Sequence, residues 1–493
     1  MDDEAEMNWS TGAGRGAASG GAANLGPLRA LLFATAALAT MGASMKTGQA
    51  ENLTGALIKA YVNNPTINSS RAAVRAADEN VPMANSGYLP IINATGSLGV
   101  AHTNNNVIFP SANGGPPAEV NFATGYHPRS YGAQINQNVF DGYQTINRIR
   151  SAESGVLESR AGLRSSEQST LLDGVTAYMD VLRDTALLEL QRNNVEVLKE
   201  QLRETRDRFT VGEVTRTDVA QAEASLSSAQ AQELTAEATL ETSIAHYRQV
   251  IGEQPTSLAP VKPIAQPLPR TLPEAVRISQ IEHPQVVEDL HAVDVAELAV
   301  KVAEGALYPK VSLTGAVTQQ FDVSATPGQR AFNAELLGNV TVPIYQGGQE
   351  YATIRQDKET LSQKELTLDQ DRDLVRRNVV QFWGQNQAQV GVIRAARASV
   401  SANEVALAGV REEAKVGQRT TLDVLNAQQA LLQARSNLVI AEHDAVVYSY
   451  SLLSAIGRLN APTLGLAVSE YDPRVHFNQV KSKLWGVRTP DGK

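Results

Sequence analysis

The stretch VGQRTTLDVLNAQQAL, residues 416–431, is matched 205 positions earlier by VGEVTRTDVAQAEASL, residues 211–226. Each stretch opens on Val-Gly and continues through a threonine and an aspartate into a run with helical spacing. This order is typical of a helix that ends at a glycine, followed by a turn and a second helix. Seven residues are identical at matching positions: Val211/Val416, Gly212/Gly417, Thr215/Thr420, Asp218/Asp423, Val219/Val424, Ala222/Ala427 and Leu226/Leu431.

The match extends over most of the chain, which indicates an internal duplication. We expect a first repeat at 51–265 and a second at 266–460. Because early matches lie 219 positions apart and later ones 205, the first repeat holds 14 additional residues, placed at about 101–130. That stretch is rich in Asn, Gly and Pro, which predicts a loop. The matching pairs are Asn64-Pro65 with His283-Pro284, Leu89-Pro90 with Tyr308-Pro309, Val139 to Gly142 with Ile344 to Gly347, and Ile251-Gly252 with Ile456-Gly457.

Six segments show helical periodicity, three in each repeat. The two longest, 143–211 and 349–416, would each measure roughly 100 Å at 1.5 Å per residue. Seams with 3-4 spacing and many alanines, as in Val424, Ala427, Leu431 and Ala434, are typical of coiled coils. In each repeat the lengths of the two shorter helices add up to nearly the length of the long helix, so we expect the two to stack end to end beside it. These shorter helices are expected at 53–88 and 217–250, and at 272–307 and 422–456.

Between the first helix and the long helix of each repeat, two stretches alternate apolar and small polar residues. Such alternation predicts β-strands with lipid on one face and water on the other. A soluble sheet with one buried face gives the same pattern. The alternating residues are Ala94, Gly96, Leu98 and Val100; Ala133, Ile135 and Val139; Val311, Leu313, Gly315 and Val317; and Val340, Val342 and Ile344.

Four strands are too few to close a membrane barrel, because spanning barrels begin at eight strands. An open sheet edge does not occur in lipid. If these strands cross a membrane, the chain must therefore form oligomers. A dimer would supply eight strands and a trimer twelve, and the residues alone do not choose between them.

The composition excludes several classes of protein. The formal net charge is −9 and the charges are spread along the chain, which argues against nucleic acid, since phosphate binding needs a basic face. There is no cysteine, so a disulfide, a thiolate nucleophile and a Cys-ligated metal are excluded.

The N-terminus has the pattern of an export signal. A basic residue, Arg29, precedes the apolar run 30–41, and the small-residue site Gly48-Gln49-Ala50 follows. Residues 1–50 are therefore expected to be a signal peptide.

The duplicated turns, the paired prolines and the stretch VPIYQGG at 342–348 occur in one order along the chain. In this order they resemble the TolC-like outer membrane factor family over about 51–460. The resemblance implies an α+β membrane protein, a homotrimer whose four strands per protomer build a twelve-stranded outer-membrane β-barrel. A long α-helical barrel would continue this β-barrel into the periplasm. The tail 461–493 lies outside the alignable part and is expected to pack around the barrel's waist or to be disordered.

The resemblance also implies a function and partners. The protein would be the exit duct of a tripartite efflux pump or type I secretion system, surrounded by outer-membrane lipid. Its partners would be a periplasmic adaptor and an inner-membrane pump or ABC transporter. The cargo, whether drugs, other small molecules or protein, does not follow from the residues.

The two matching turns carry the candidate site residues, which the resemblance places at a periplasmic entrance. The expected adaptor-docking residues are Val211, Gly212, Thr215, Val416, Gly417 and Thr420, and the expected entrance and gating residues are Thr217, Asp218, Arg419, Asp423 and Asn426. In a symmetric ring, copies of Asp423 would converge near the axis and favour cations. Arg419 would pair with Asp218 of a neighbouring protomer. From the local sequence, the two aspartates are equally explained as residues that stabilise helix N-termini.

Two positions depart from the family pattern. The family's well-studied member has an aspartate where this chain has Asn426, and a tyrosine where it has Ala414. With these two polar groups replaced, we expect fewer polar links across the entrance and a leakier resting state.

We expect no catalytic, cofactor-binding or metal-binding site. The seven histidines show no metal-ligand spacing, and His283, beside Pro284, is expected to be structural. A structural or adhesive periplasmic coiled-coil protein is the alternative. It explains the helical seams but not the four amphipathic stretches.

Overall fold

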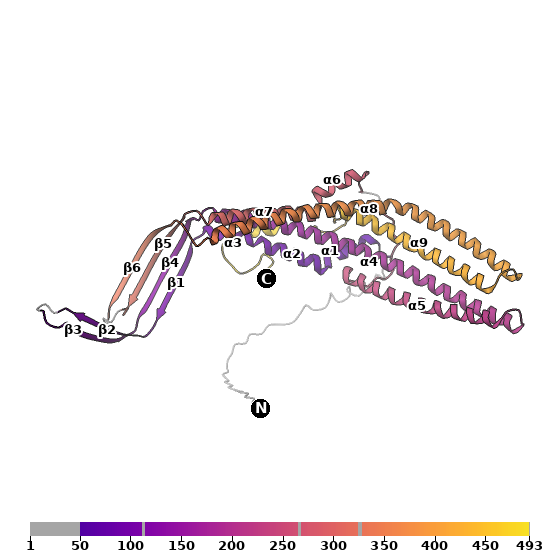
Figure 1. Ribbon diagram of the computed structural model, residues 1–493, viewed down its shortest axis with the longest axis horizontal. Helices are drawn as coiled ribbons and strands as arrows, with labels where there is room; N and C mark the ends of the chain where they lie inside the picture. The colour runs from indigo at the N-terminus through magenta and orange to yellow at the C-terminus, as the bar shows by residue number, and fades with distance from the viewer. Residues whose placement is uncertain (1–49, 111–113, 265–267, 324–327, 493) are drawn as a thin grey trace, which may run out of the picture. The chain divides into compact units, whose positions relative to one another are not determined.

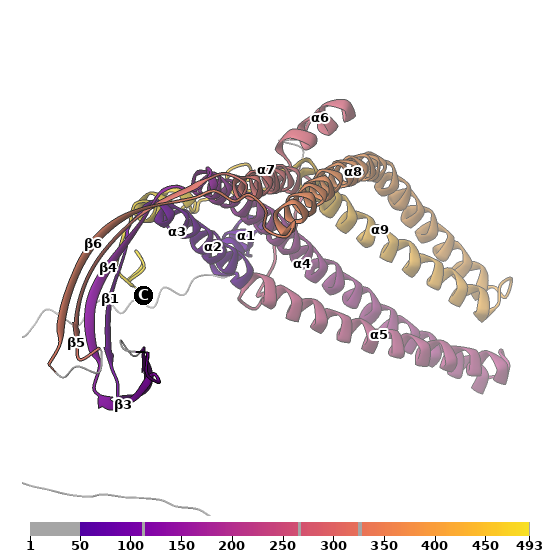
Figure 2. The ribbon, with the colours of Figure 1, turned by 60° about the vertical axis from the view of Figure 1, so that its left-hand side comes forward.

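The computed structural model describes residues 50–492, except 111–113, 265–267 and 324–327. Apart from Ala50, the expected signal peptide lies outside the described residues. From Ala50 onward the chain forms a single unit, in which long helices continue from a β-sheet (Figures 1 and 2). Of the helices within the described residues, none combines the length and the apolar composition that a membrane span needs.

Each repeat contains one long helix followed by a shorter one. α4 (Gln144–Thr210) and α8 (Gln349–Lys415) have 67 residues each. α5 (Arg216–Ile251) and α9 (Thr421–Ile456) have 36 each. The predicted bounds of these four helices are confirmed to within one residue. α5 packs along α4, α9 packs along α8, and α4 also contacts α9, so the two repeats pack on each other.

The two remaining helices, expected as continuous at 53–88 and 272–307, are interrupted, and that prediction is wrong. One break in each segment precedes a proline, and there Asn64 and His283 share φ −62° and ψ 126°. The helical conformation is disfavoured there, because the proline ring collides with the preceding backbone. The first segment is divided into α1 (Leu53–Asn63), α2 (Pro65–Asp78), α3 (Asn80–Asn85) and a 3-10 turn (Ser86–Tyr88), and the second into α6 (Leu272–Glu282) and α7 (Pro284–Gly305).

The residue before each proline also caps the helix that follows. Asn64 Oδ1 accepts from the Thr66 N–H at 2.8 Å, while its Nδ2 donates to the Val250 carbonyl at 2.9 Å. His283 Nδ1 accepts from the Gln285 N–H at 3.2 Å. Burial lowers the pKa of His283 to about 4, so the ring is neutral and free to accept. His283 is therefore a helix cap, as expected of a structural residue.

The main hydrophobic core lies where both repeats meet. Leu57 of α1, Tyr178 of α4, Ile251 of α5 and Leu453 of α9 are buried together there. Full burial of such a side chain contributes about 1.5–3 kcal/mol. α2 and α5 then lie along successive parts of α4 (Figure 1), which agrees with the length argument.

The C-terminal tail packs on the first repeat over its described residues. Leu466 joins the main core, and α10 (Pro473–Val480) packs on α2. His476 Nδ1 lies 2.9 Å from Asp78 Oδ2, with both residues buried. Over 461–480 the tail is therefore packed on the helices, while its expected position around a barrel's waist stays a prediction.

The strands form an antiparallel sheet in the order β1-β4-β5-β6. Its members are β1 (Ile91–Leu98), β4 (Arg129–Phe140), β5 (Lys310–Phe321) and β6 (Arg330–Thr341). The predicted two strands per repeat are present in this sheet. The last strand ends at Thr341, so its expected extension to Ile344 is wrong; Pro343 has no N–H to donate to a ladder.

The additional residues of the first repeat are not a loop, as was expected, but a second antiparallel pair. β2 (Ala101–Phe109) pairs with β3 (Ala118–Tyr126) in a separate two-stranded sheet. Gly114 to Pro117 lie in the connection between them, whereas Asn104 to Asn106 lie within β2 and Gly125 within β3. β-branched and aromatic residues on both sides, such as Val107 opposite Val120, favour strands.

We predict that Asn64→Ala destabilises the protein by about 2 kcal/mol, because it removes a helix cap and leaves the buried Val250 carbonyl unpaired. Asn63→Ala is the matched control, since Asn63 is the exposed neighbour. Chemical denaturation of both variants checks this. Equal effects of the two changes would contradict the capping role.

Candidate functional site

The two matching turns end α4 and α8 in the same way. Gly212 has φ +83° and its N–H donates to the Phe209 carbonyl at 3.0 Å, while the Glu213 N–H donates to Arg208 at 2.9 Å. Gly417 has φ +78°, and the Gly417 and Gln418 N–H groups make the equivalent bonds at 3.2 and 2.9 Å. This is the Schellman arrangement, in which a left-handed glycine lets the last carbonyls of a helix be satisfied. The expected role of both glycines as helix ends is confirmed.

The next helices begin with two equivalent capping boxes. The Thr215 N–H and hydroxyl both donate to Asp218 Oδ2, at 2.8 and 2.6 Å. The Thr420 N–H and hydroxyl donate to Asp423 Oδ2, at 3.0 and 2.9 Å. These hydrogen bonds hold the pKa of both aspartates below the usual 3.8. The helix-start interpretation of the aspartates is therefore correct, with the threonines Thr215 and Thr420 as caps.

One helix start differs from the expected one by a single residue. The second helix of the first repeat begins at Arg216, so Thr217 lies in its first turn and is exposed. The reason is chemical: the capping threonine must stand three residues before the aspartate, and Thr215 does.

The ion pair of Arg419 lies within its own turn. Its Nε is 2.8 Å from Glu413 Oε2, and hydrogen bonding to Glu413 raises the pKa of the guanidinium. In the first repeat Arg208 Nε lies 3.1 Å from Glu213 Oε2. The two turns thus carry similar ion pairs with acid and base exchanged. We find no hydrogen bond or ion pair between the two turns among the described residues of one chain.

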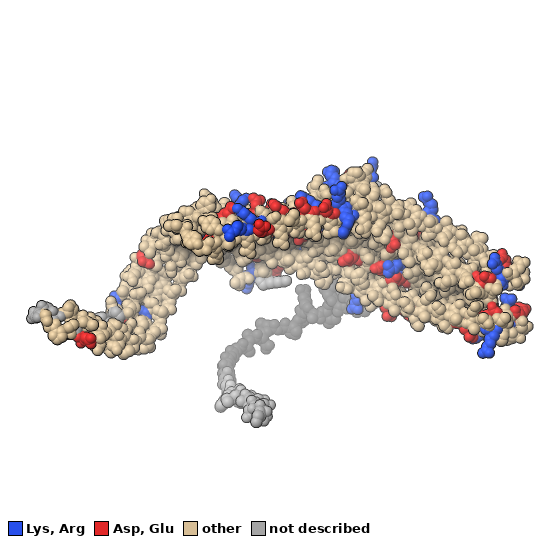
Figure 3. Space-filling view, in the orientation of Figure 1, with Lys and Arg blue, Asp and Glu red and all other residues tan. Residues whose placement is uncertain are grey.

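Charged side chains gather at the ends of both helix pairs (Figure 3). Val211, Gly212, Val416 and Gly417 are all exposed. A Cβ added at either glycine would meet open space. The expected docking residues are therefore accessible. Asn426 lines a hollow of about 300 Å³ between α9 and the α4/α5 pair.

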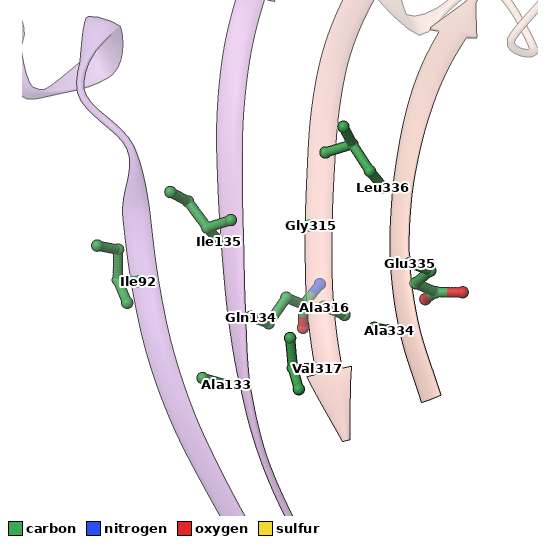
Figure 4. A pocket seen from close by; sticks show the side chains of 10 residues that line it. All are labelled: Ile92, Ala133, Gln134, Ile135, Gly315, Ala316, Val317, Ala334, Glu335 and Leu336. Atoms are coloured by element: carbon green, nitrogen blue, oxygen red, sulfur yellow. The ribbon is translucent and has the colours of Figure 1, made fainter. Parts of the chain in front are cut away.

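The sheet has two chemically different faces. Register places Ile92, Ile135, Gly315 and Leu336 in one row across the four strands. The adjacent row, which faces the other way, holds Asn93, Gln134, Ala316 and Glu335. Figure 4 shows the apolar side chains over Gly315, around a hollow of about 540 Å³. Ile92 and Leu336 are 69% and 71% exposed, so this face is apolar and uncovered.

A partly buried polar cluster, missed from the sequence, joins the two repeats at mid-helix. His443 Nε2 lies 3.0 Å from Asp180 Oδ1 of α4, and its Nδ1 lies 2.9 Å from Asp444 Oδ1. Arg183 pairs with both Asp180 and Asp184, at 2.7 Å each. Burial alone would lower the pKa of His443, but hydrogen bonds to the two carboxylates outweigh it and hold the pKa above 6.5. Only the imidazolium can donate from both nitrogens at once.

Most of the chain is similar in sequence to known proteins. The sequence profile of the outer membrane efflux protein family matches residues 56–253 and 276–458. The chain belongs to this family. It is 43% identical to the outer membrane efflux protein BepC of Brucella suis, over 93% of this chain and 97% of BepC. It is 26% identical to the alkaline protease secretion protein AprF of Pseudomonas aeruginosa, over 68% and 71%.

Solved structures show the same fold. The Campylobacter jejuni CmeC outer membrane channel aligns with a TM-score of 0.72 at 18% identity, over 88% of this chain and 89% of CmeC. The protein is therefore an outer-membrane channel of the efflux and secretion class, with its helical part in the periplasm, and not an enzyme. The alternative of an adhesive coiled-coil protein gains no support.

We predict that the contact between the repeats weakens in alkaline solution. Because the folded-state pKa of His443 is raised, its contribution is complete below about 6.5 and is lost as pH rises through the folded-state pKa. His443→Gln should flatten this dependence, while His291→Gln, a partly exposed histidine of α7, should retain it. Thermal unfolding followed by circular dichroism across that range decides. An unchanged pH profile in His443→Gln would rule out the histidine as the cause.

Proposed function

We propose that three copies of this chain form one conduit, in which the twelve strands of three sheets close a barrel in the outer membrane. The observation that carries the proposal is the two-faced sheet. The row of Ile92, Ile135, Gly315 and Leu336 suits acyl chains, and the polar row behind it suits a water-filled interior. β1 and β6 are the sheet's edges within one chain, and lipid does not tolerate open edges.

The helices support the same assembly. α4 buries 21 residues within the chain, whereas α8, of equal length, buries only six. Apolar side chains of α8 such as Leu366 and Val390 are 68% and 65% exposed. A helix of this length with so few buried residues needs a further partner. A neighbouring protomer supplies one, so the helices would continue the barrel as a closed ring.

The partners follow from the class of system. We infer that the exposed turns at Val211-Gly212 and Val416-Gly417, together with Thr215 and Thr420, dock a periplasmic adaptor that connects to an inner-membrane pump or ABC transporter. BepC is named as an efflux protein and AprF as a protease secretion protein. The higher identity to BepC favours efflux as the main task.

We further propose that the turns form the entrance, with Thr217, Asp218, Arg419, Asp423 and Asn426 around it. A ring of ionised Asp423 carboxylates would attract cations. Within one chain Arg419 is held by Glu413, so a bond from Arg419 to Asp218 of a neighbour requires exchange of partners. Such an exchange would give the entrance two alternative pairings of Arg419, and a gate needs two states of this kind.

We expect a trimer in detergent, and we expect Leu366→Glu to reduce the trimer fraction severalfold, because it places a charge against the neighbouring protomer. Glu365→Gln, at the exposed adjacent position, is the control and should leave assembly unchanged. Light scattering on the purified proteins measures this. A monodisperse folded monomer of the unaltered chain would overturn the assembly.

We also expect Arg419→Ser to raise the conductance in planar bilayers, and Asp423→Ala to lower cation selectivity. Thr420→Ala breaks the same capping box but keeps the charge, and should therefore keep the selectivity. If Asp423→Ala and Thr420→Ala behave alike, the aspartate acts only as a helix cap.

A further inference from the structure

The segment KSKLWGVR, residues 481–488, follows α10 and exposes its apolar side chains. Leu484, Trp485 and Val487 are 67%, 85% and 100% exposed. The chain turns at Gly486, with φ +105°, and Lys483 Nζ donates to the Arg488 carbonyl across the turn. An uncovered tryptophan between two aliphatic residues is unusual on a surface that faces only water.

The segment lies where the sheet begins. Asn85 Nδ2 donates to the Lys481 carbonyl at 3.5 Å, and Asn85 is the last residue of α3. Only the short turn Ser86–Tyr88 and two further residues separate it from β1. Figure 2 shows the C-terminal trace beside α3 and the start of the strands. Neighbouring Met83 and Tyr88 are 63% and 48% exposed.

The charge of this segment is opposite to that of the chain as a whole. No acidic residue occurs from 473 to 490, whereas Arg474, Lys481, Lys483 and Arg488 are basic, in a chain of net charge −9. Within the part of the chain that the structure describes, Lys481, Lys483 and Arg488 make no ion pair. Lysine and arginine beside a membrane are attracted by anionic lipid headgroups. Tryptophan prefers the boundary between headgroups and acyl chains.

We propose that residues 481–488 bind the phospholipid surface of the membrane leaflet next to the helices. Trp485, Leu484 and Val487 enter the headgroup boundary, and the basic side chains contact anionic headgroups. The inference rests on the proposed function, in which the sheet crosses that membrane. The segment fixes the depth of the barrel, because α10 ties it to α2 through the buried contact of His476 with Asp78.

The test uses tryptophan fluorescence. The chain has three tryptophans, at positions 9, 383 and 485, so Trp9→Phe with Trp383→Phe leaves Trp485 as the sole reporter. The full-length protein is reconstituted into vesicles of phosphatidylethanolamine and phosphatidylglycerol with brominated acyl chains. We expect most of the Trp485 fluorescence to be quenched relative to vesicles without bromine. We also expect its emission maximum to lie at a shorter wavelength than that of a tryptophan exposed to water.

Two sets of variants sharpen the test. Lys481→Gln, Lys483→Gln and Arg488→Gln together should reduce quenching at least about twofold. Lys199→Gln, Arg203→Gln and Lys415→Gln, which remove three exposed charges near the helix turns, should not. Replacing phosphatidylglycerol with phosphatidylcholine should mimic the first set. Equal quenching by both sets would overturn the role of the basic residues.

The outcome also separates this inference from the proposed function. Protein that fails to float with the vesicles would contradict the membrane-spanning sheet itself. Protein that floats and conducts, but whose Trp485 is unquenched and emits at long wavelength, would overturn only the lipid contact. Unquenched emission at short wavelength would place the segment against a second copy of the chain and would overturn it equally.

Discussion

Backbone hydrogen bonding at the edges of the β1-β4-β5-β6 sheet is the constraint on which the proposed architecture depends. An unpaired N–H or C=O group in hydrocarbon costs several kcal/mol. Within one chain β1 and β6 each pair on one side only. Closure by further copies removes this cost, and it brings the helices of neighbouring chains together at the same time. The sparse burial of α8 beside the dense burial of α4 is consistent with that demand.

The long helices could be predicted from the sequence because their ends are set locally. Gly212 and Gly417 supply the left-handed residue, and Thr215 and Thr420 supply the caps. The strands of the main sheet were predictable because their two faces differ chemically. The breaks at Asn64 and His283 were visible as X-Pro pairs, but helical spacing on both sides masked them. In the additional stretch of the first repeat, the Asn, Gly and Pro residues led to the prediction of a loop, although β-branched residues of β2 and β3 in the same stretch favour strands.

The candidate site was predicted only in part, for a physical reason. Which residues occupy the turns follows from the duplication, whereas their partners depend on the fold around each turn. Glu413 reaches Arg419 across the Schellman turn, and helical spacing gives no sign of that contact. The cluster of Asp180, Arg183 and His443 depends on how α4 and α9 are aligned. No pattern within either helix records that alignment.

The capping boxes determine how the charge at the helix tips responds to pH. Because each carboxylate of Asp218 and Asp423 receives hydrogen bonds from its own threonine, both stay ionised well into acid. The tips of the helix pairs therefore present constant negative charge at these positions across the acidities that a periplasm meets. By contrast, the charge of His443, midway along the helices, changes as the pH passes its raised pKa. The group whose charge changes with acidity, His443, is thus separated in space from the carboxylates at the helix tips, so the charge of one can change without altering the other.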